Sequence, residues 1–186
     1  TEVKGSTSTF RRTSIKNFGD ITCRYKCFIN TFRTVKKKIN INNWVAFRND
    51  PIILKGEKMK IEEFNKEMNG NLKELDIELS EKQLKQFYDY MNILIEWNKV
   101  MNLTNIIEPE EVIKKHFIDS LTVLKHIKED GSIIDVGTGA GFPGIVLKIV
   151  YPNLKITLVD ALQKRVNYLN AIIKDLQLEN IQAIHT

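Results

Sequence analysis

The glycine-rich segment at 137–144 constrains the fold more than any other part of the chain. It follows a short apolar run that ends in Asp135, and the apolar stretch 145–150 follows the glycines at once. A strand, a glycine turn and a helix in this order form the first unit of a doubly wound α/β sheet. The glycines let the backbone approach a ligand closely, which a Cβ atom would prevent. We therefore expect a parallel sheet with a ligand site at the turn.

Two further strands extend this unit. Residues 155–160 form a mainly apolar run that ends in Asp160, residues 163–176 have helical character, and residues 181–185 begin a third strand. An acid at the end of the second strand, about twenty residues beyond the glycines, is placed to bind ribose hydroxyls. The expected fold is therefore α/β and Rossmann-like, with N-terminal helices that precede the sheet in the chain.

The position of Asp135 distinguishes two nucleotide-type cofactors. Gly139, Gly141 and Gly144 satisfy the dinucleotide pattern of NAD enzymes. However, the first glycine after the strand is Gly137, so the NAD register would start late. S-adenosylmethionine (SAM) carries a positive sulfonium, whereas NAD carries a pyrophosphate, so an acid before the turn attracts SAM and repels NAD. The sequence therefore predicts SAM as the cofactor.

Two amphipathic helices are expected before the sheet. The segment 80–83 fits a capping box for a helix of about twenty residues that ends near Met101. A second helix is expected to begin at Pro109, a favoured first helical position. His116 and Asp119 lie on one face of it, where they can share a hydrogen bond, and a structural role is favoured over a catalytic one. The apolar positions interpreted as core are Leu84, Phe87, Tyr88, Met91, Leu94 and Ile95 in the first helix and Val112, Ile113, Phe117, Leu121 and Leu124 in the second.

Residues 1–58 differ in composition from the rest of the chain. They hold 13 of the 28 lysine and arginine residues but only 4 of the 23 acidic ones, and their apolar groups share no period. Because 55–59 can be encoded by a purine-rich ribosome-binding sequence and a start codon, we expect Met59 to be the natural start. Residues 1–58 are then a disordered or non-native upstream extension, and a basic RNA-binding arm is the alternative. A helical module at 59–130 and the first part of the SAM-binding domain at 131–186 complete the expected division.

Several classes of protein and site are not indicated by the sequence. No run of about 18 apolar residues predicts a membrane span. The first residues lack the apolar stretch of a secretory signal, so a cytoplasmic location and no membrane partner are expected. Cys23 and Cys27 have neither zinc-knuckle nor redox-pair spacing, and no metal is expected.

Taken together, these motifs resemble the ribosomal RNA small-subunit methyltransferase G family, formerly called glucose-inhibited division protein B. The similarity runs from Met59 to Thr186 in the order and spacing of that family. The segments that carry it are 97–104, 115–121, 135–144, 158–160 and 164–166.

The resemblance implies a class I SAM-dependent methyltransferase fold and methylation of guanine N7 in 16S ribosomal RNA. The implied partner is 16S RNA or the small ribosomal subunit, and Lys164 and Arg165 are candidates for contact with RNA phosphate. No catalytic residue is assigned, because N7 has a free lone pair and alignment of the reactants can supply most of the rate. The expected cofactor-binding residues are Asp135, Gly137, Thr138, Gly139, Gly141, Phe142 and Asp160.

A complete fold of this class has about seven strands, with the fourth beside the first. We expect this chain to stop after the third strand, which leaves the first as an exposed apolar edge that favours aggregation. We also expect the chain alone to bind SAM weakly or not at all and not to methylate. Two alternatives remain: a SAM-dependent methyltransferase with a different substrate, and a non-catalytic RNA-binding protein that uses residues 1–58.

Overall fold

The computed structural model describes residues 59–186, and the expectations for residues 1–58 lie outside that range. Helix α3 (Ile61–Leu72) begins just after Met59, and a 3-10 turn, η2 (Lys73–Leu75), follows it. The residues that α3 buries recur every four positions, which is the spacing of one helix face. These residues are Phe64, Met68 and Leu72.

Helix α4 (Glu81–Met101) confirms the first helix predicted from the sequence. Ser80 Oγ accepts a hydrogen bond from Gln83 N, and Gln83 Oε1 accepts one from Ser80 N at 2.9 Å, so the capping box is present. The helix ends at Asn102, whose left-handed backbone (φ 50°) stops the helical bonding.

The second predicted helix begins at Pro109, as expected, but its interior is not regular. It consists of α5 (Pro109–Val112), a π-helical segment η3 (Ile113–Ile118) and α6 (Asp119–Leu121), and the 3-10 turn η4 (Leu124–His126) follows. A π-helical turn is wider than an α-helical one, which the periodicity of apolar residues does not reveal. All five positions interpreted as the core of this helix are buried: Val112, Ile113, Phe117, Leu121 and Leu124.

The sheet consists of three parallel strands in the order β1-β2-β3. The strand bounds, β1 (Ser132–Val136), β2 (Lys155–Asp160) and β3 (Ile181–His185), agree with the runs predicted from the sequence. The helices α7 (Gly144–Val150) and α8 (Gln163–Asp175) connect the strands. The expected α/β fold with a parallel sheet is thus confirmed for the described residues.

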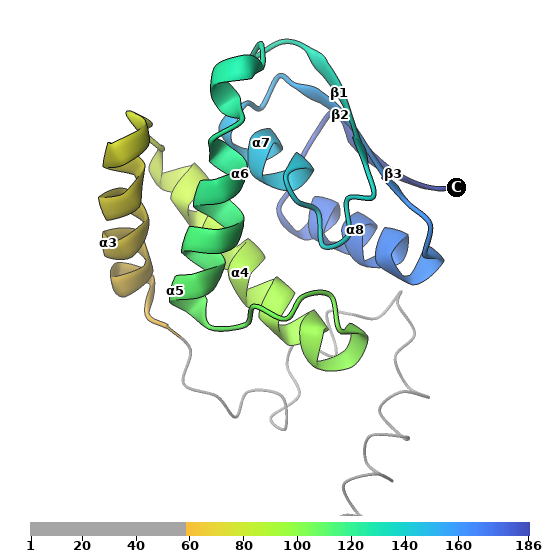
Figure 1. Ribbon diagram of the computed structural model, residues 1–186, viewed down its shortest axis with the longest axis horizontal. Helices are drawn as coiled ribbons and strands as arrows, with labels where there is room; N and C mark the ends of the chain where they lie inside the picture. Colours follow the sequence, from red (N-terminus) through yellow and green to blue (C-terminus); the bar gives the residue numbers. More distant parts are fainter. Residues whose placement is uncertain (1–58) are drawn as a thin grey trace, which may run out of the picture. The chain divides into compact units, whose positions relative to one another are not determined.

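Helices cover the sheet on one side only. Figure 1 shows α7 and α8 on the same side of the strands, and α4 packs against both helices. Trp97 of α4 meets Tyr168 of α8 edge to face at 5.4 Å, and Gln86 Nε2 donates to the Leu176 carbonyl at 2.8 Å. The helical segments and the sheet therefore share one core.

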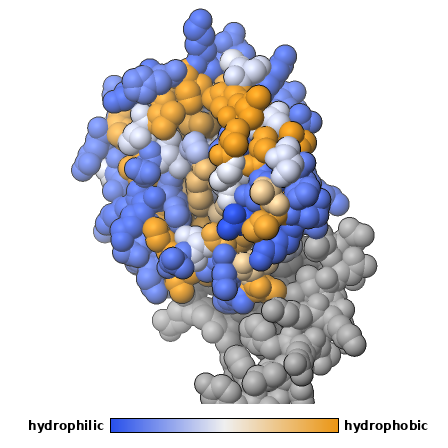
Figure 2. Space-filling model, turned by 45° about the vertical axis from the view of Figure 1, so that its right-hand side comes forward, coloured by the Kyte–Doolittle hydropathy of each residue, from blue (hydrophilic) through white to orange (hydrophobic). Residues whose placement is uncertain are grey.

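No described helix covers the other face of the sheet (Figure 1). Apolar side chains on this side of the molecule are exposed (Figure 2). Ile134 and Val136 of the edge strand β1 are 68% and 77% exposed, and Ile184 of β3 is 40% exposed. Val136, Val159 and Ile184 are paired across the three strands, so they form one row of this open face. The exposed apolar edge strand predicted from the sequence is present among the described residues.

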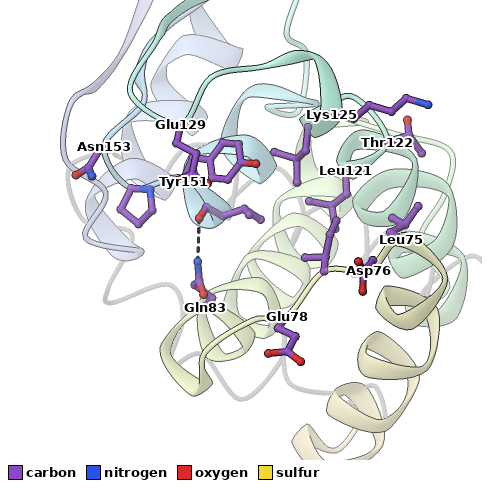
Figure 3. A pocket seen from close by; sticks show the side chains of 14 residues that line it. Leu75, Asp76, Glu78, Gln83, Leu121, Thr122, Lys125, Glu129, Tyr151 and Asn153 are labelled. Carbon is purple, nitrogen blue, oxygen red and sulfur yellow. Dashed lines mark hydrogen bonds between the residues drawn. The ribbon is translucent and has the colours of Figure 1, made fainter.

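A hollow of about 540 Å³ lies at the opposite end of the strands from the glycine loop (Figure 3). It is lined by the segment after η2, the turn η4 and the connection from α7 to β2. Gln83 also lines it, and its Nε2 donates a hydrogen bond to the Val150 carbonyl at 3.0 Å. The carboxylates that line it, Asp76, Glu78 and Glu129, are exposed. Within residues 59–186, no helix is long and apolar enough to cross a membrane, and no cluster of side chains has the composition of a metal site.

Candidate functional site

The glycine loop begins where β1 ends, at the carboxyl edge of the sheet. The amides of Gly137 and Thr138 both donate to the Val159 carbonyl of β2, at 2.8 and 3.2 Å. Gly141 has φ 103°, and a Cβ atom there would lie 2.4 Å from Ile145 Cδ1. The loop therefore folds tightly against the ends of both strands, and this position requires glycine.

Asp135 holds the beginning of the loop and the start of α7 together. Its Oδ2 accepts hydrogen bonds from Thr138 Oγ1 at 2.7 Å and from Gly144 N at 2.9 Å. Burial raises the pKa of the Asp135 carboxyl above its usual value, and these two hydrogen bonds oppose that shift because they favour the carboxylate. An acidic group thus lies directly beside the loop, where the sequence placed it.

Asp160 lies under the tip of the loop and is only 3% exposed. Its Oδ2 accepts from Gly139 N at 3.0 Å and its Oδ1 from Leu162 N at 2.8 Å. Arg165 Nη1 lies 3.5 Å from Oδ2 and forms an ion pair with it. The structure therefore brings Asp160 into contact with the loop, whereas its binding of a ribose stays a prediction.

The two basic residues proposed for RNA differ in their surroundings. Lys164 is exposed at the start of α8, whereas Arg165 is partly buried and pairs with Asp160. The structure thus gives Arg165 a partner within the site that the sequence did not indicate. Contact of either residue with RNA phosphate stays a prediction.

Aromatic side chains of the helical module pack against the loop at Phe142. The imidazole of His116 stacks on the Phe142 ring, with ring centroids 4.4 Å apart and planes inclined by 11°. Tyr90 of α4 lies 5.3 Å from the same ring, and its hydroxyl donates to the Ala140 carbonyl at 2.8 Å. Burial raises the pKa of Tyr90 well above its usual value, so the phenol keeps the proton that it donates.

The hydrogen bond of His116 goes to Thr104 and not to Asp119, the partner that the sequence suggested. Thr104 Oγ1 and His116 Nε2 are 2.9 Å apart, and Asp119 is exposed. Burial lowers the pKa of His116 and the negative charge of Asp119 partly offsets that shift, so the neutral ring is favoured. Asn98 Oδ1 accepts from the amides of Leu103 and Thr104, at 2.5 and 2.9 Å, and so fixes the turn after α4.

One residue and one contact of this arrangement escaped the sequence prediction. Tyr90 was not among the expected core positions, although it follows Phe87 by three residues and its side chain is fully buried. The i+3 step along the predicted stripe was the only signal available for it. For the contact between His116 and Phe142 no sequence signal exists, because it depends on how the helical module docks on the loop.

These observations define the class of the protein. It is an α/β protein with a parallel sheet, a glycine loop at the carboxyl edge of that sheet, and two buried or half-buried carboxylates bonded to the loop. Comparison with known families identifies it further. The chain belongs to the GidB family, rRNA small subunit methyltransferase G, whose model matches residues 83–186.

Curated relatives agree with this family. The chain is 54% identical over 116 residues to ribosomal RNA small subunit methyltransferase G of Lachnoclostridium phytofermentans, and 57% identical over 115 residues to that of Desulforamulus reducens. Each alignment covers 61% of this chain and 48% of the relative. The protein of the same name from Clostridium botulinum is 49% identical over 125 residues, which cover 66% of this chain and 52% of the relative. The chain thus spans about half the length of the curated relatives it matches.

Proposed function

We propose that this protein transfers a methyl group from SAM to N7 of a guanine in 16S ribosomal RNA. The observation that carries the proposal is the family match over residues 83–186, the stretch that builds the glycine loop and both of its carboxylates. Because 16S RNA is a cytoplasmic molecule in bacteria, the proposal also implies a cytoplasmic location.

The residues at the loop fit SAM. A Cβ atom added to Gly137 would meet no atom within 4 Å, so open space lies beside the backbone where β1 ends. The Asp135 carboxylate favours a cation next to the loop. Asp160 Oδ1 accepts one hydrogen bond, from Leu162, and can accept a second from a ribose hydroxyl. When bound, SAM supplies a methyl group activated by its positive sulfur.

The chemistry explains why no general base is needed in this arrangement. N7 of guanine has an unprotonated lone pair, so nothing has to be deprotonated before attack. The contribution of the protein is then to align N7 with the methyl group and to exclude other orientations. The guanine must be accessible, in an unpaired loop or after flipping, and Lys164 and Arg165 are candidates to contact the RNA backbone.

The proposal is tested in a chimera in which residues 59–186 replace the matching part of the Desulforamulus reducens relative. The chimera is incubated with methyl-labelled SAM and with small ribosomal subunits that carry no methyl group at the target. Label is expected in 16S RNA and is expected to vanish when the RNA contains 7-deazaguanine, which has carbon in place of N7. Label that persists in the 7-deaza RNA, or that enters protein instead, would contradict the proposal and favour a methyltransferase with a different substrate.

The SAM site has its own test. SAM is titrated by calorimetry into this chain and into the chimera, and we expect the chimera to bind and this chain to bind more weakly. Replacement of Asp135 by Ala in the chimera is expected to weaken binding about tenfold or more, since a charge-assisted contact is lost. An unchanged affinity for SAM would show that Asp135 does not contribute to cofactor binding.

A further inference from the structure

We propose that His116 is a positioning residue of the cofactor loop, which fixes the ring of Phe142 from the helical module. The inference rests on the proposed function, because the place of Phe142 has a consequence for activity only if the loop binds SAM. His116 lies 26 residues before Phe142 in the chain and belongs to a different element, so the contact joins two parts of the fold.

The first support is the geometry of the two rings. Centroids 4.4 Å apart with planes inclined by 11° describe a close stack, in which one ring limits the movement of the other. His116 is carried by the π-helical segment, and its carbonyl accepts a hydrogen bond from Ser120 Oγ at 2.5 Å. Phe142 lies in the loop, outside any helix or strand. The imidazole is therefore the anchored partner, and the loop side chain is the one that it restrains.

The second support is the hydrogen bond that sets the orientation of the imidazole. Thr104 Oγ1 already accepts from the Ile106 amide at 3.1 Å. The hydroxyl has one proton to donate, and we assign that proton to His116 Nε2, 2.9 Å away, which places the ring proton on Nδ1. Rotation of the ring away from Phe142 would break this bond.

The hydrogen bond between Thr104 and His116 makes it possible to distinguish a positioning role of His116 from simple filling of space. A ring that only filled space would tolerate the loss of the Thr104 hydroxyl, because Val has nearly the same shape. If the hydroxyl orients the imidazole, Thr104→Val loosens Phe142 although both rings remain. Thr104→Ser restores the hydroxyl and should restore the loop.

The first experiment uses this chain without cofactor. Amide hydrogen exchange is measured at Gly141 and Phe142, whose amides donate to the Thr138 carbonyl at 2.9 and 3.1 Å. In His116→Ala and Thr104→Val, exchange at these amides is expected to rise about three- to tenfold, the range that the loss of one aromatic contact implies, while exchange in β2 stays unchanged. Thr104→Ser is expected to behave as the wild type. Thr122→Val, which removes an exposed hydroxyl that donates to the Asp119 carbonyl, is the matched control.

A spectroscopic measurement on the same samples reports the orientation directly. The nitrogen-15 shifts of the three histidine side chains distinguish the two neutral tautomers. His116 is expected as the Nδ1–H tautomer in the wild type and as a mixture in Thr104→Val. A predominant Nε2–H form in the wild type, or loop exchange that does not respond to either substitution in a folded protein, would overturn the inference.

The second experiment separates this inference from the proposed function. SAM affinity is measured for the chimera with and without His116→Ala and Thr104→Val, and a loss of about three- to tenfold is expected for both. If the parent chimera does not bind SAM, the proposed function fails, whereas the exchange data still decide whether His116 orders the loop. If the parent binds and both variants bind equally well, the positioning role is refuted and the proposed function stands.

Discussion

The carboxylate of Asp160 accepts a hydrogen bond from the backbone amide of Gly139, and the two atoms lie 3.0 Å apart. The other carboxylate oxygen accepts from Leu162 N at 2.8 Å. This buried group thus holds the tip of the glycine loop to the end of β2. Asp160→Asn replaces one acceptor by an NH₂ donor, which leaves one buried N–H without a partner. We expect the free energy of unfolding, measured in urea, to fall by about 1–3 kcal/mol.

The control for this prediction is Asp130→Asn. Asp130 is exposed just before β1, and a neutral side chain there should change the free energy of unfolding by no more than about 0.5 kcal/mol. Equal losses in the two variants would mean that the general loss of negative charge, and not the bond to Gly139, determines the effect.

Gly144, the first residue of α7, is a second position where an added methyl group would meet neighbouring atoms. A Cβ atom there would lie 2.3 Å from Leu158 Cδ2 and 2.8 Å from Asp135 Oδ2. Gly144→Ala would therefore force β2 and the start of α7 apart and weaken the hydrogen bond from Gly144 N to Asp135. The expected loss of stability is about 1–3 kcal/mol, measured by urea unfolding.

Gly70→Ala, the same chemical change at another glycine, is expected to have the opposite effect on stability. Gly70 lies in the helix α3, and an added Cβ atom would meet nothing within 4 Å. Gly70→Ala should stabilise the protein by about 0.5–1 kcal/mol, because alanine loses less conformational entropy in a helix. A loss of stability at both glycines would show that close approach at Gly144 is not the cause.

Local patterns predicted most of the elements correctly, because each depends on neighbours in the sequence. The capping box at Ser80 set the start of α4, and the apolar runs ending at Asp135 and Asp160 placed the ends of β1 and β2 to within one residue. The contacts of Tyr90 with Ala140 and of His116 with Phe142 were not predictable in this way. They join residues 50 and 26 positions apart, and only the packing of the helical module on the loop brings them together.

The stability of the fold should depend on pH through His116. Burial lowers its pKa below the ordinary 6.5, so between the folded pKa and 6.5 the unfolded chain binds more protons than the folded one. Stability therefore rises with pH across this window, and the contribution of His116 is lost as the pH falls from 6.5 through the folded pKa. His116→Phe, which keeps a ring but cannot be protonated, should flatten this part of the curve. Urea unfolding at a series of pH values measures this dependence of the free energy of unfolding on pH.

His126 is the comparison for the pH effect. It is exposed in the turn η4, and His126→Asn serves as the control for the loss of a histidine. A curve that flattens equally in the two variants would assign the pH dependence to general charge and not to the half-buried imidazole beside Phe142.

The open face of the sheet should make this chain associate with itself. Ile134 and Val136 are 68% and 77% exposed on a strand whose outer edge is unpaired among the described residues, a combination that favours contact with a second copy. The double substitution Ile134→Thr and Val136→Thr keeps residues with good strand propensity but removes most of the apolar surface. Sedimentation velocity over a concentration series should show less association for this variant than for the wild type. Ile107→Thr, which removes an apolar side chain that is 48% exposed in the connection between α4 and α5, should leave association unchanged. If Ile107→Thr lowers association as much as the double variant, the sheet face is not the surface through which copies meet.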